Sequence, residues 1–471
     1  MAMGTRRKRQ HQQDLFYTAE LAEAPGHPFY TKLNAALEDA DFDGFCEQRC
    51  QAFYHHRLGR PSLTPGSYFR LQLIGFFEGV GSERGIAWRV ADSLSLRRFL
   101  GYGLDEATPD HVTLSRTRRL LDAETHQAVF SWVLERLGEA GLLRGKTIGV
   151  DATTLEANAA MRSIVRRATG EQYREYLKKL AAADGEPTDA AALQRRDRKR
   201  KKRVSNKDWV NPHDPEAEIT KMKDGRTRLA YKAEQAVDLE TGAIVAMTTH
   251  PGATGDTTSI RETVPEAGEA LAEQIATTQT VHPEGVAEVV ADKGYHSAAT
   301  LETLTEWGLR SYVSEPKRGR RKWRGKIAQQ AATYANRRRV TGARGKQLLR
   351  SRGEKLERPF AHQYETGGMR RMWVRGLDEV HKKLLLQAAA CNLALLLRTK
   401  YGAGTPRGLA QARKAICALI LALSELPIPP EAPFSNRISY RSIFDRDRFS
   451  NARRTCSFRR HPKMGGFDTG C

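Results

Sequence analysis

Apolar residues recur at three- and four-residue spacing through residues 61–143. Leu71, Ile74 and Phe77 form one such series, and Ile86 and Val90 begin the next. This period places apolar side chains on one face of a helix. We therefore predict that the N-terminal region is all-helical.

Within that region, the stretch TPDHVTLSRTRRLL predicts a short helix with a cationic face. Thr108 can cap this helix, with Pro109 at its first position. Its Arg116 and Arg118 are candidate DNA contacts in the manner of a helix-turn-helix. This segment alone favours the simpler alternative, a solvated helix face.

From residue 146 onward the pattern changes to short β-branched runs separated by turns. Two runs each end in an aspartate, Asp151 after KTIGV and Asp292 after AEVVA. The other predicted strands are 229–238, 243–250 and 310–316, and predicted helices lie at 257–275 and 297–308. Antiparallel strands followed by alternating strands and helices predict an α/β fold, a mixed sheet with flanking helices.

An exposed insertion is predicted at about residues 158–225, after the first strand. It begins with a predicted helix over 161–185 and contains the basic tract RRDRKRKKR at 195–203. That tract is either a contact to a DNA backbone or a solvated loop. Further on, the apolar run 384–397 contains Gln387 and Asn392 and is too short for a membrane span, so it predicts a core helix.

The charge balance points to a polyanionic partner. Among 471 residues, Lys and Arg number 77 against 55 Asp and Glu, a net charge of +22, and nucleic acid is the natural partner for such an excess. Six cysteines in so long a chain are not a disulfide framework. With no secretory signal pattern at the N-terminus, we expect a cytoplasmic protein that is not membrane-bound.

Four potential zinc ligands lie close together in CEQRCQAFYHH. Cys46 and Cys50 share a helix face at i and i+4, which favours packing as small apolar groups. Adjacent His55 and His56 fit zinc spacing poorly.

Asp151 and Asp292 can meet if their strands are neighbours in the sheet. Two adjacent carboxylates repel unless a cation lies between them. Hard divalent cations with oxygen ligands are the usual solution, Mg²⁺ above all with phosphate substrates. Two such ions support phosphodiester cleavage, although either aspartate taken singly is more simply a turn former.

Several stretches resemble bacterial insertion-sequence transposases of the IS1182 type, related to the IS4 and IS5 families. They are VDATTLEANAAMRSIVRR, NPHDPEAEITKMKDGRTRLAYKAEQAVDLETGAIVA, VVADKGYHS and GEKLERPFAHQYETGGMRRMWVRG. The resemblance implies a ribonuclease-H-like mixed sheet with flanking helices, preceded by an all-helical N-terminal domain. The expected domains are 1–143 for DNA binding, 144–400 for catalysis, and 401–471 as a helical C-terminal segment with a basic tail.

The resemblance also implies a catalytic triad of acids that hold two Mg²⁺ or Mn²⁺ ions. Asp151 matches the first acid, and Asp292 matches the second within an Asp-x-Gly-aromatic motif. Glu357 in LERPF matches the third, with Glu354 and Glu365 as alternatives. The family's arginine position falls on Gly353, and Arg352 is one residue away.

The implied activity is a metal-dependent DDE transposase. Such enzymes cut the 3′ ends of their element with water and join them to target DNA, and acting on two ends implies a homodimer in the complex with double-stranded DNA. The expected location is the nucleoid. Alternatives are an inactive DNA-binding descendant and a nuclease without strand transfer. Candidate DNA contacts are Arg116, Arg118, Arg320, Arg321, Lys322, Trp323, Arg358, Arg370 and Arg371.

Overall fold

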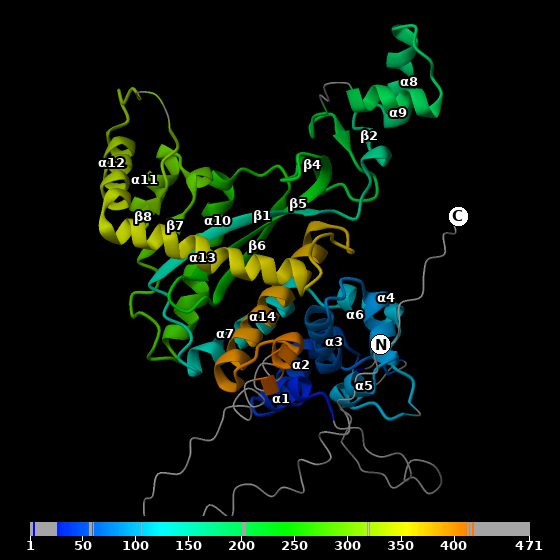
Figure 1. Cartoon of the computed structure of the whole chain (residues 1–471), viewed down its shortest axis with the longest axis vertical. Coiled ribbons are helices and arrows are strands. Elements are labelled where there is room, and N and C mark those ends of the chain that lie inside the picture. Colours follow the sequence, from blue (N-terminus) through cyan, green and yellow to red (C-terminus); the bar gives the residue numbers. More distant parts are fainter. Residues whose placement is uncertain are drawn as a thin grey trace, which may run out of the picture. The chain divides into compact units, whose positions relative to one another are not determined.

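The computed structural model describes residues 3–4, 26–55, 59, 61–104, 106–199, 204–317, 319, 321–411, 414 and 417–418. The described residues up to Lys414 belong to one compact unit (Figure 1).

The N-terminal region is helical, as predicted. The helices are α1 (Pro28–Glu38), α2 (Phe42–Cys50), α3 (Pro65–Glu78), α4 (Glu83–Ala91), α5 (Leu94–Leu100), α6 (His111–Leu120) and α7 (Ala123–Glu139), with a 3-10 turn η1 (Gln51–Phe53). Helix α3 is buried along nearly its whole length and supplies Tyr68, Phe69 and Ile74 to the core. The apolar period of the sequence therefore forms the interior of this region.

The predicted cap of α6 is wrong by two residues. The helix begins at His111, and Asp110 rather than Thr108 is its N-cap. The Asp110 carboxylate accepts a hydrogen bond from the Thr113 amide at 2.8 Å. A carboxylate also interacts favourably with the positive end of the helix dipole, which an uncharged threonine does less well.

Six strands form one mixed sheet. They are β1 (Thr147–Glu156), β4 (Glu218–Lys221), β5 (Thr227–Asp238), β6 (Ile244–Pro251), β7 (Glu288–Ala291) and β8 (Arg310–Val313). The order is β4-β5-β1-β7-β8, and β6 also pairs with β5. Strands β5 and β6 run antiparallel to their neighbours, whereas β1, β7 and β8 are parallel. The predicted mixed sheet is confirmed.

The expectation that β1 ends at Asp151 is wrong. Its parallel pairing with β7 stops at Val150↔Ala291, but its antiparallel pairing with β5 continues to Glu156↔Ala230. The longer partner β5 keeps β1 extended for another five residues after Asp151. Asp151 therefore lies inside β1, just where β1 loses β7 as a neighbour.

The insertion is only partly helical. It holds η2 (Met161–Ser163), β2 (Val165–Arg166), α8 (Tyr173–Ala183), α9 (Ala190–Lys199) and β3 (Trp209–Val210). The helix predicted over 161–185 starts only at Tyr173, because Val165 pairs with Val210 and Gly170 turns the chain with a φ of 69°. Tyr173, Tyr176 and Trp209 pack ring against ring as a small core of its own.

Helices cover both faces of the sheet. Helix α10 (Asp256–Ile275) packs on one face, while α13 (Ala343–Glu365) and α14 (Leu377–Tyr401) lie on the other. In Figure 1, α13 crosses in front of the sheet. Helices α11 (Ala298–Glu306) and α12 (Ile327–Thr341) pack beside β8, and η3 (Lys293–Tyr295) follows β7.

Helix α14 confirms the prediction of a core helix. Its Asn392 side chain bonds to both backbone groups of Ile244, at 2.9 and 2.8 Å. Within the described residues, Leu377–Gln411 is one helical stretch long and apolar enough to cross a membrane, and 83% of its most apolar window is buried in the protein.

Candidate active site

Asp151 and Asp292 lie side by side at the end of the parallel strands. The register Val150↔Ala291 brings the next residue of each strand, Asp151 and Asp292, to the same level. Asp292 leaves β7 and caps the short turn η3, where its Oδ1 accepts a hydrogen bond from the Gly294 amide at 2.7 Å. The sheet thus brings together two carboxylates that are far apart in the sequence.

The surroundings of Asp151 oppose its negative charge. Burial raises the pKa of this carboxyl above its usual value, and the charge of Asp292 adds to the increase. Arg352 of α13 opposes that increase, with its Nη1 3.6 Å from the Asp151 Oδ2. The Ala152 amide also donates to Asp151, at 2.9 Å. A carboxylate pair in this state gains from a cation placed between its members.

Arg352 is a partner that the sequence pattern did not identify. The family pattern puts an arginine at the next position, which is Gly353 here. In the structure Arg352 and Leu356 point from α13 toward β1, one to Asp151 and the other to Gly149. The helix face, rather than the spacing in the motif, decides which side chain meets the aspartate.

Glu357 lies on α13 and is exposed. Seven residues later, Tyr364 occupies the same side of the helix. The Tyr364 hydroxyl contacts Thr153 Oγ1 at 2.8 Å and donates to the Thr154 carbonyl at 2.9 Å. Since Thr153 shares a strand face with Asp151, Glu357 projects from the side of α13 that borders this part of β1.

The two alternative acids have other surroundings. Glu354 pairs with Arg358 at 2.9 Å, and Glu365 lines a cavity between α13 and α14. Within the described residues, no group of three or more His, Cys, Asp or Glu side chains is arranged to hold a metal ion. The structure therefore does not bring Glu354, Glu357 or Glu365 into a metal-holding group with Asp151 and Asp292.

A buried charge network lies behind Asp292, on the face covered by α10. Tyr295 of the Asp-x-Gly-aromatic motif donates its hydroxyl proton to Glu234 Oε1 at 2.8 Å. Ser259 donates to the same oxygen at 2.6 Å, and Thr263 donates to the other. Lys232 Nζ lies 3.8 Å from Glu234 and 2.6 Å from Asp256. Burial raises the pKa of Glu234, while these donors oppose the increase.

This network explains the motif around Asp292. A Cβ at Gly294 would lie 2.3 Å from Asp256 Oδ2, so a larger residue there would have to displace the Asp256 carboxylate. Tyr295 is 1% exposed, and its phenol ties the turn to β5. Sequence reasoning missed Lys232 and Glu234. The available signal was the pair of charges at alternate positions in the apolar first part of the strand LAYKAEQAVD.

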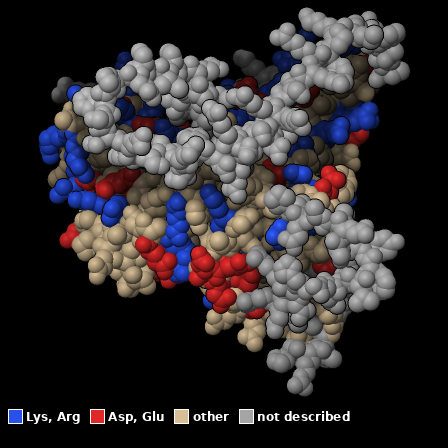
Figure 2. Space-filling model, turned by 60° about the horizontal axis from the view of Figure 1, so that its bottom comes forward, with Lys and Arg blue, Asp and Glu red and all other residues tan. Residues whose placement is uncertain are grey.

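The predicted DNA contacts have different environments. Arg116 and Lys322 are exposed, and so are Arg358, Arg370 and Arg371. Arg118 is only 12% exposed and pairs with Glu83 at 2.7 Å and with Glu379, so it ties α6 to α4 and α14. Arg320 lies outside the described residues. On the face drawn in Figure 2, Lys and Arg side chains gather in several groups.

Trp323 packs against neighbouring side chains of the protein. Its ring meets the edge of Tyr334 at 6.2 Å between centroids, and Arg321 lies over it at 5.7 Å. Cys46 and Cys50 are fully buried free cysteines on α2. Burial raises the pKa of the Cys50 thiol to about 12, which keeps it neutral as an apolar packing group.

Two protein families match the chain. Residues 18–120, which include α1 to α6, match a family described as "Transposase domain (DUF772)". Residues 193–393 match "Transposase DDE domain", and this match includes Asp292 and Glu357 but begins after Asp151. No curated protein matches the chain significantly, and neither does any solved structure. Both matched families are therefore described as transposase domains, one over the helical N-terminal region and the other over most of the sheet region.

Proposed function

We propose that this protein binds the ends of an insertion sequence, cleaves the 3′ ends by metal-dependent hydrolysis, and joins them to target DNA. The observation that carries the proposal is the pairing of β1 with β7, which sets Asp151 beside Asp292. Strands β6, β5, β1, β7 and β8, with three parallel strands on one side, also follow the order of a ribonuclease-H-like sheet.

The two aspartates fit a divalent cation such as Mg²⁺ or Mn²⁺. They supply hard oxygen ligands from rigid strands, and the pKa of Asp151 is raised by burial and by its acidic neighbour. When bound, two ions activate a water or hydroxyl and stabilise the leaving oxygen in phosphodiester chemistry. Tyr295 and Glu234 orient Asp292, and Glu357 completes the acid set from α13.

Further parts of the proposal follow the family resemblance. The chain would be of the IS1182 type, with residues 1–143 for DNA binding, 144–400 for catalysis and 401–471 as a C-terminal segment. Double-stranded element ends and target DNA are the partners, and a homodimer acts on the paired ends. The net charge of +22 supports such a partner. Arg116, Lys322, Arg358, Arg370 and Arg371 contact phosphates.

One observation favours a second candidate, a DNA-binding protein without catalysis. The described residues hold no gathered group of three acids, so cutting requires Glu357 to join the two aspartates. A binder of this kind retards DNA in a gel without cutting it. A nuclease lacking strand transfer would cut the element end but give no joined product.

The test uses the full-length protein with a labelled duplex that carries its own element's end, in Mg²⁺ or Mn²⁺. We expect cleavage at the element boundary and a joined product with target DNA, both lost in Asp292→Asn. Asp208→Asn, which changes an exposed aspartate of the insertion, is the matched control. Retardation without cleavage in wild type and variant alike would support the inactive binder instead.

A further inference from the structure

We propose that the cleft between α13 and α14 is a second DNA-backbone site, which binds phosphates of a DNA segment other than the strand held at Asp151 and Asp292. The inference rests on the proposed function and specifies a further contact surface for the same DNA substrate.

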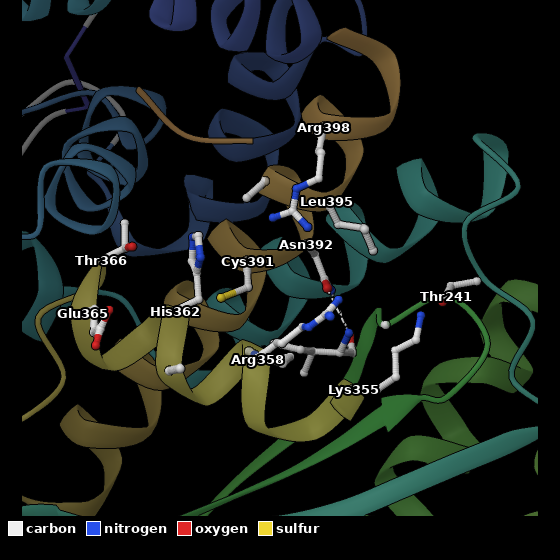
Figure 3. Close-up of a pocket in the computed structure, with 15 residues that line it drawn as sticks. Thr241, Lys355, Arg358, His362, Glu365, Thr366, Cys391, Asn392, Leu395 and Arg398 are labelled. Carbon is white, nitrogen blue, oxygen red and sulfur yellow. Dashed lines mark hydrogen bonds between the residues drawn. The ribbon is translucent and has the colours of Figure 1, made fainter. Parts of the chain in front are cut away.

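The cleft is a cavity lined by cationic side chains. Its volume is about 430 Å³, and it is bounded by α13, α14 and the turn between β5 and β6. Figure 3 shows Lys355, Arg358 and His362 rising from α13, with Arg398 reaching in from α14. Among the described residues, Glu365 is the one carboxylate in its lining. Three permanent positive charges against one negative charge make a site for an anion.

A histidine also lines the cleft. The His362 ring lies against Phe76, with 5.4 Å between the centroids. Its Nε2 is buried and has no hydrogen-bond partner among the described residues. A buried polar atom without a partner is costly unless a ligand supplies one. A phosphate in the cleft would reach this atom only after the imidazole ring turned toward it.

The lining chemistry suits an oxyanion such as a phosphate better than an apolar ligand. Arg358 and Arg398 present planar guanidinium groups suited to bidentate contact with phosphate oxygens, and Lys355 adds a point charge at the mouth of the cleft. Within the part of the chain that the structure describes, Lys355 contacts the Glu240 carbonyl at 3.4 Å and Arg358 contacts Glu354 at 2.9 Å. Both contacts lie at exposed side chains and exchange readily for a phosphate.

This site is separate from the aspartate pair. Helix α13 turns Arg352 and Leu356 toward β1, but it turns Lys355, Arg358 and His362 toward α14. The cleft adjoins the turn at Thr241 and Gly242. This turn lies near the start of β1, because the Leu239 amide donates to the Thr147 carbonyl at 3.0 Å. A strand held at Asp151 is on the other side of the helix, so the cleft takes another stretch of DNA backbone.

The test measures the salt dependence of binding by the full-length protein to a labelled duplex of arbitrary sequence, in EDTA so that no strand is cut. Each lost phosphate contact reduces the magnitude of the slope of log K against log salt concentration by about 0.9. For Lys355→Gln/Arg398→Gln we therefore expect a slope lower by about 1.8 and weaker binding at every salt concentration. Unchanged thermal melting of the variant confirms that it is folded.

The matched control is Arg261→Gln/Lys221→Gln, which removes the same charge from exposed positions on α10 and β4. An equal decrease in slope for both double variants would overturn the proposal, because overall charge would then explain it. An unchanged slope in the cleft variant would overturn it as well. A third result would also overturn the proposal: inorganic phosphate stabilises wild type but not the cleft variant, and the two proteins bind DNA equally. The cleft would then hold a small anion rather than DNA. Because binding is read without cleavage, failure here is distinct from failure of the catalytic proposal.

Discussion

At the scale of single residues, the site depends on what neutralises each buried charge. Glu234 is fully buried, and three hydroxyl donors and Lys232 surround it. Asp151 is less well compensated, with Arg352 3.6 Å away. Glu234 is therefore a carboxylate with a structural role, whereas the charge of Asp151 is only partly compensated.

Tyr295→Phe tests the anchor behind Asp292. Removing the hydroxyl takes one donor from a buried carboxylate, so we expect a loss of about 1–3 kcal/mol in the free energy of unfolding. Urea denaturation measures it. Tyr334→Phe, at a side chain 38% exposed, is the control and should stay within about 0.5 kcal/mol of wild type. Equal losses in both variants would argue against the anchoring role.

Asp151→Asn tests the electrostatics of the aspartate pair. The folded pKa of Asp151 lies above its unfolded value, so the folded state binds the proton more tightly. Ionisation therefore costs stability progressively as pH rises through the unfolded and then the folded pKa. Without divalent ions, we expect the variant to melt above wild type at neutral pH and the difference to vanish in acid. A variant that melts below wild type at neutral pH would contradict this.

Added Mg²⁺ should reverse that order. An ion bound only by the folded protein stabilises it by RT ln(1 + [L]/Kd), about 1.4 kcal/mol at ten times Kd. We expect wild type to gain melting temperature in Mg²⁺ and Asp151→Asn to gain little. Equal gains in the two proteins would place the ion elsewhere.

At the scale of elements, the sequence predicts the regular parts of the sheet well. The β5–β6 hairpin follows from apolar runs around the Thr241-Gly242 turn, and Gly242 indeed has a φ of 86°. The length of β1 could not be predicted, because β5 sets it through pairs that lie far away in the sequence. The predicted start of the first insertion helix was wrong for a related reason, because the pairing of β2 with β3 overrides the local helix preference.

Helix α13 carries the least predictable part of the site. Its motif contains three glutamates, which differ in the direction in which their side chains project from the helix. Tyr364 ties the Glu357 side to β1, whereas Glu354 pairs with Arg358 and Glu365 faces α14. The network around Glu234 was missed because the sequence shows two charges in the strand but not the distant hydroxyl groups that compensate them.

Substituting the three glutamates one by one tests this assignment. We expect Glu357→Gln to lower the single-turnover rate of element-end cleavage by at least about 100-fold, beyond the range of a residue that acts through another ligand. Glu354→Gln and Glu365→Gln should cut at rates near wild type. If either of these variants lost cleavage while Glu357→Gln stayed active, the third acid would be that glutamate and not Glu357.

At the scale of the whole molecule, helices α1 to α7 and the sheet region belong to one compact unit. Arg118 of α6 bonds to Glu379 of α14, and Lys383 of α14 donates to the Gly81 carbonyl at 3.0 Å. The sequence could indicate both regions from their different periodicities. It could not show that ion pairs join them, since this depends on packing between distant segments.

A metal switch at Asp292 would show whether the two paired aspartates hold the ions. In Asp292→Cys, a softer thiolate replaces a hard oxygen ligand, which disfavours Mg²⁺ more than Mn²⁺. If Asp151 and Asp292 hold the ions for cleavage, element-end cleavage by this variant is lost in Mg²⁺ and regained in Mn²⁺, while wild type cuts in both. Cleavage by the variant in Mg²⁺ at the wild-type rate would contradict the account.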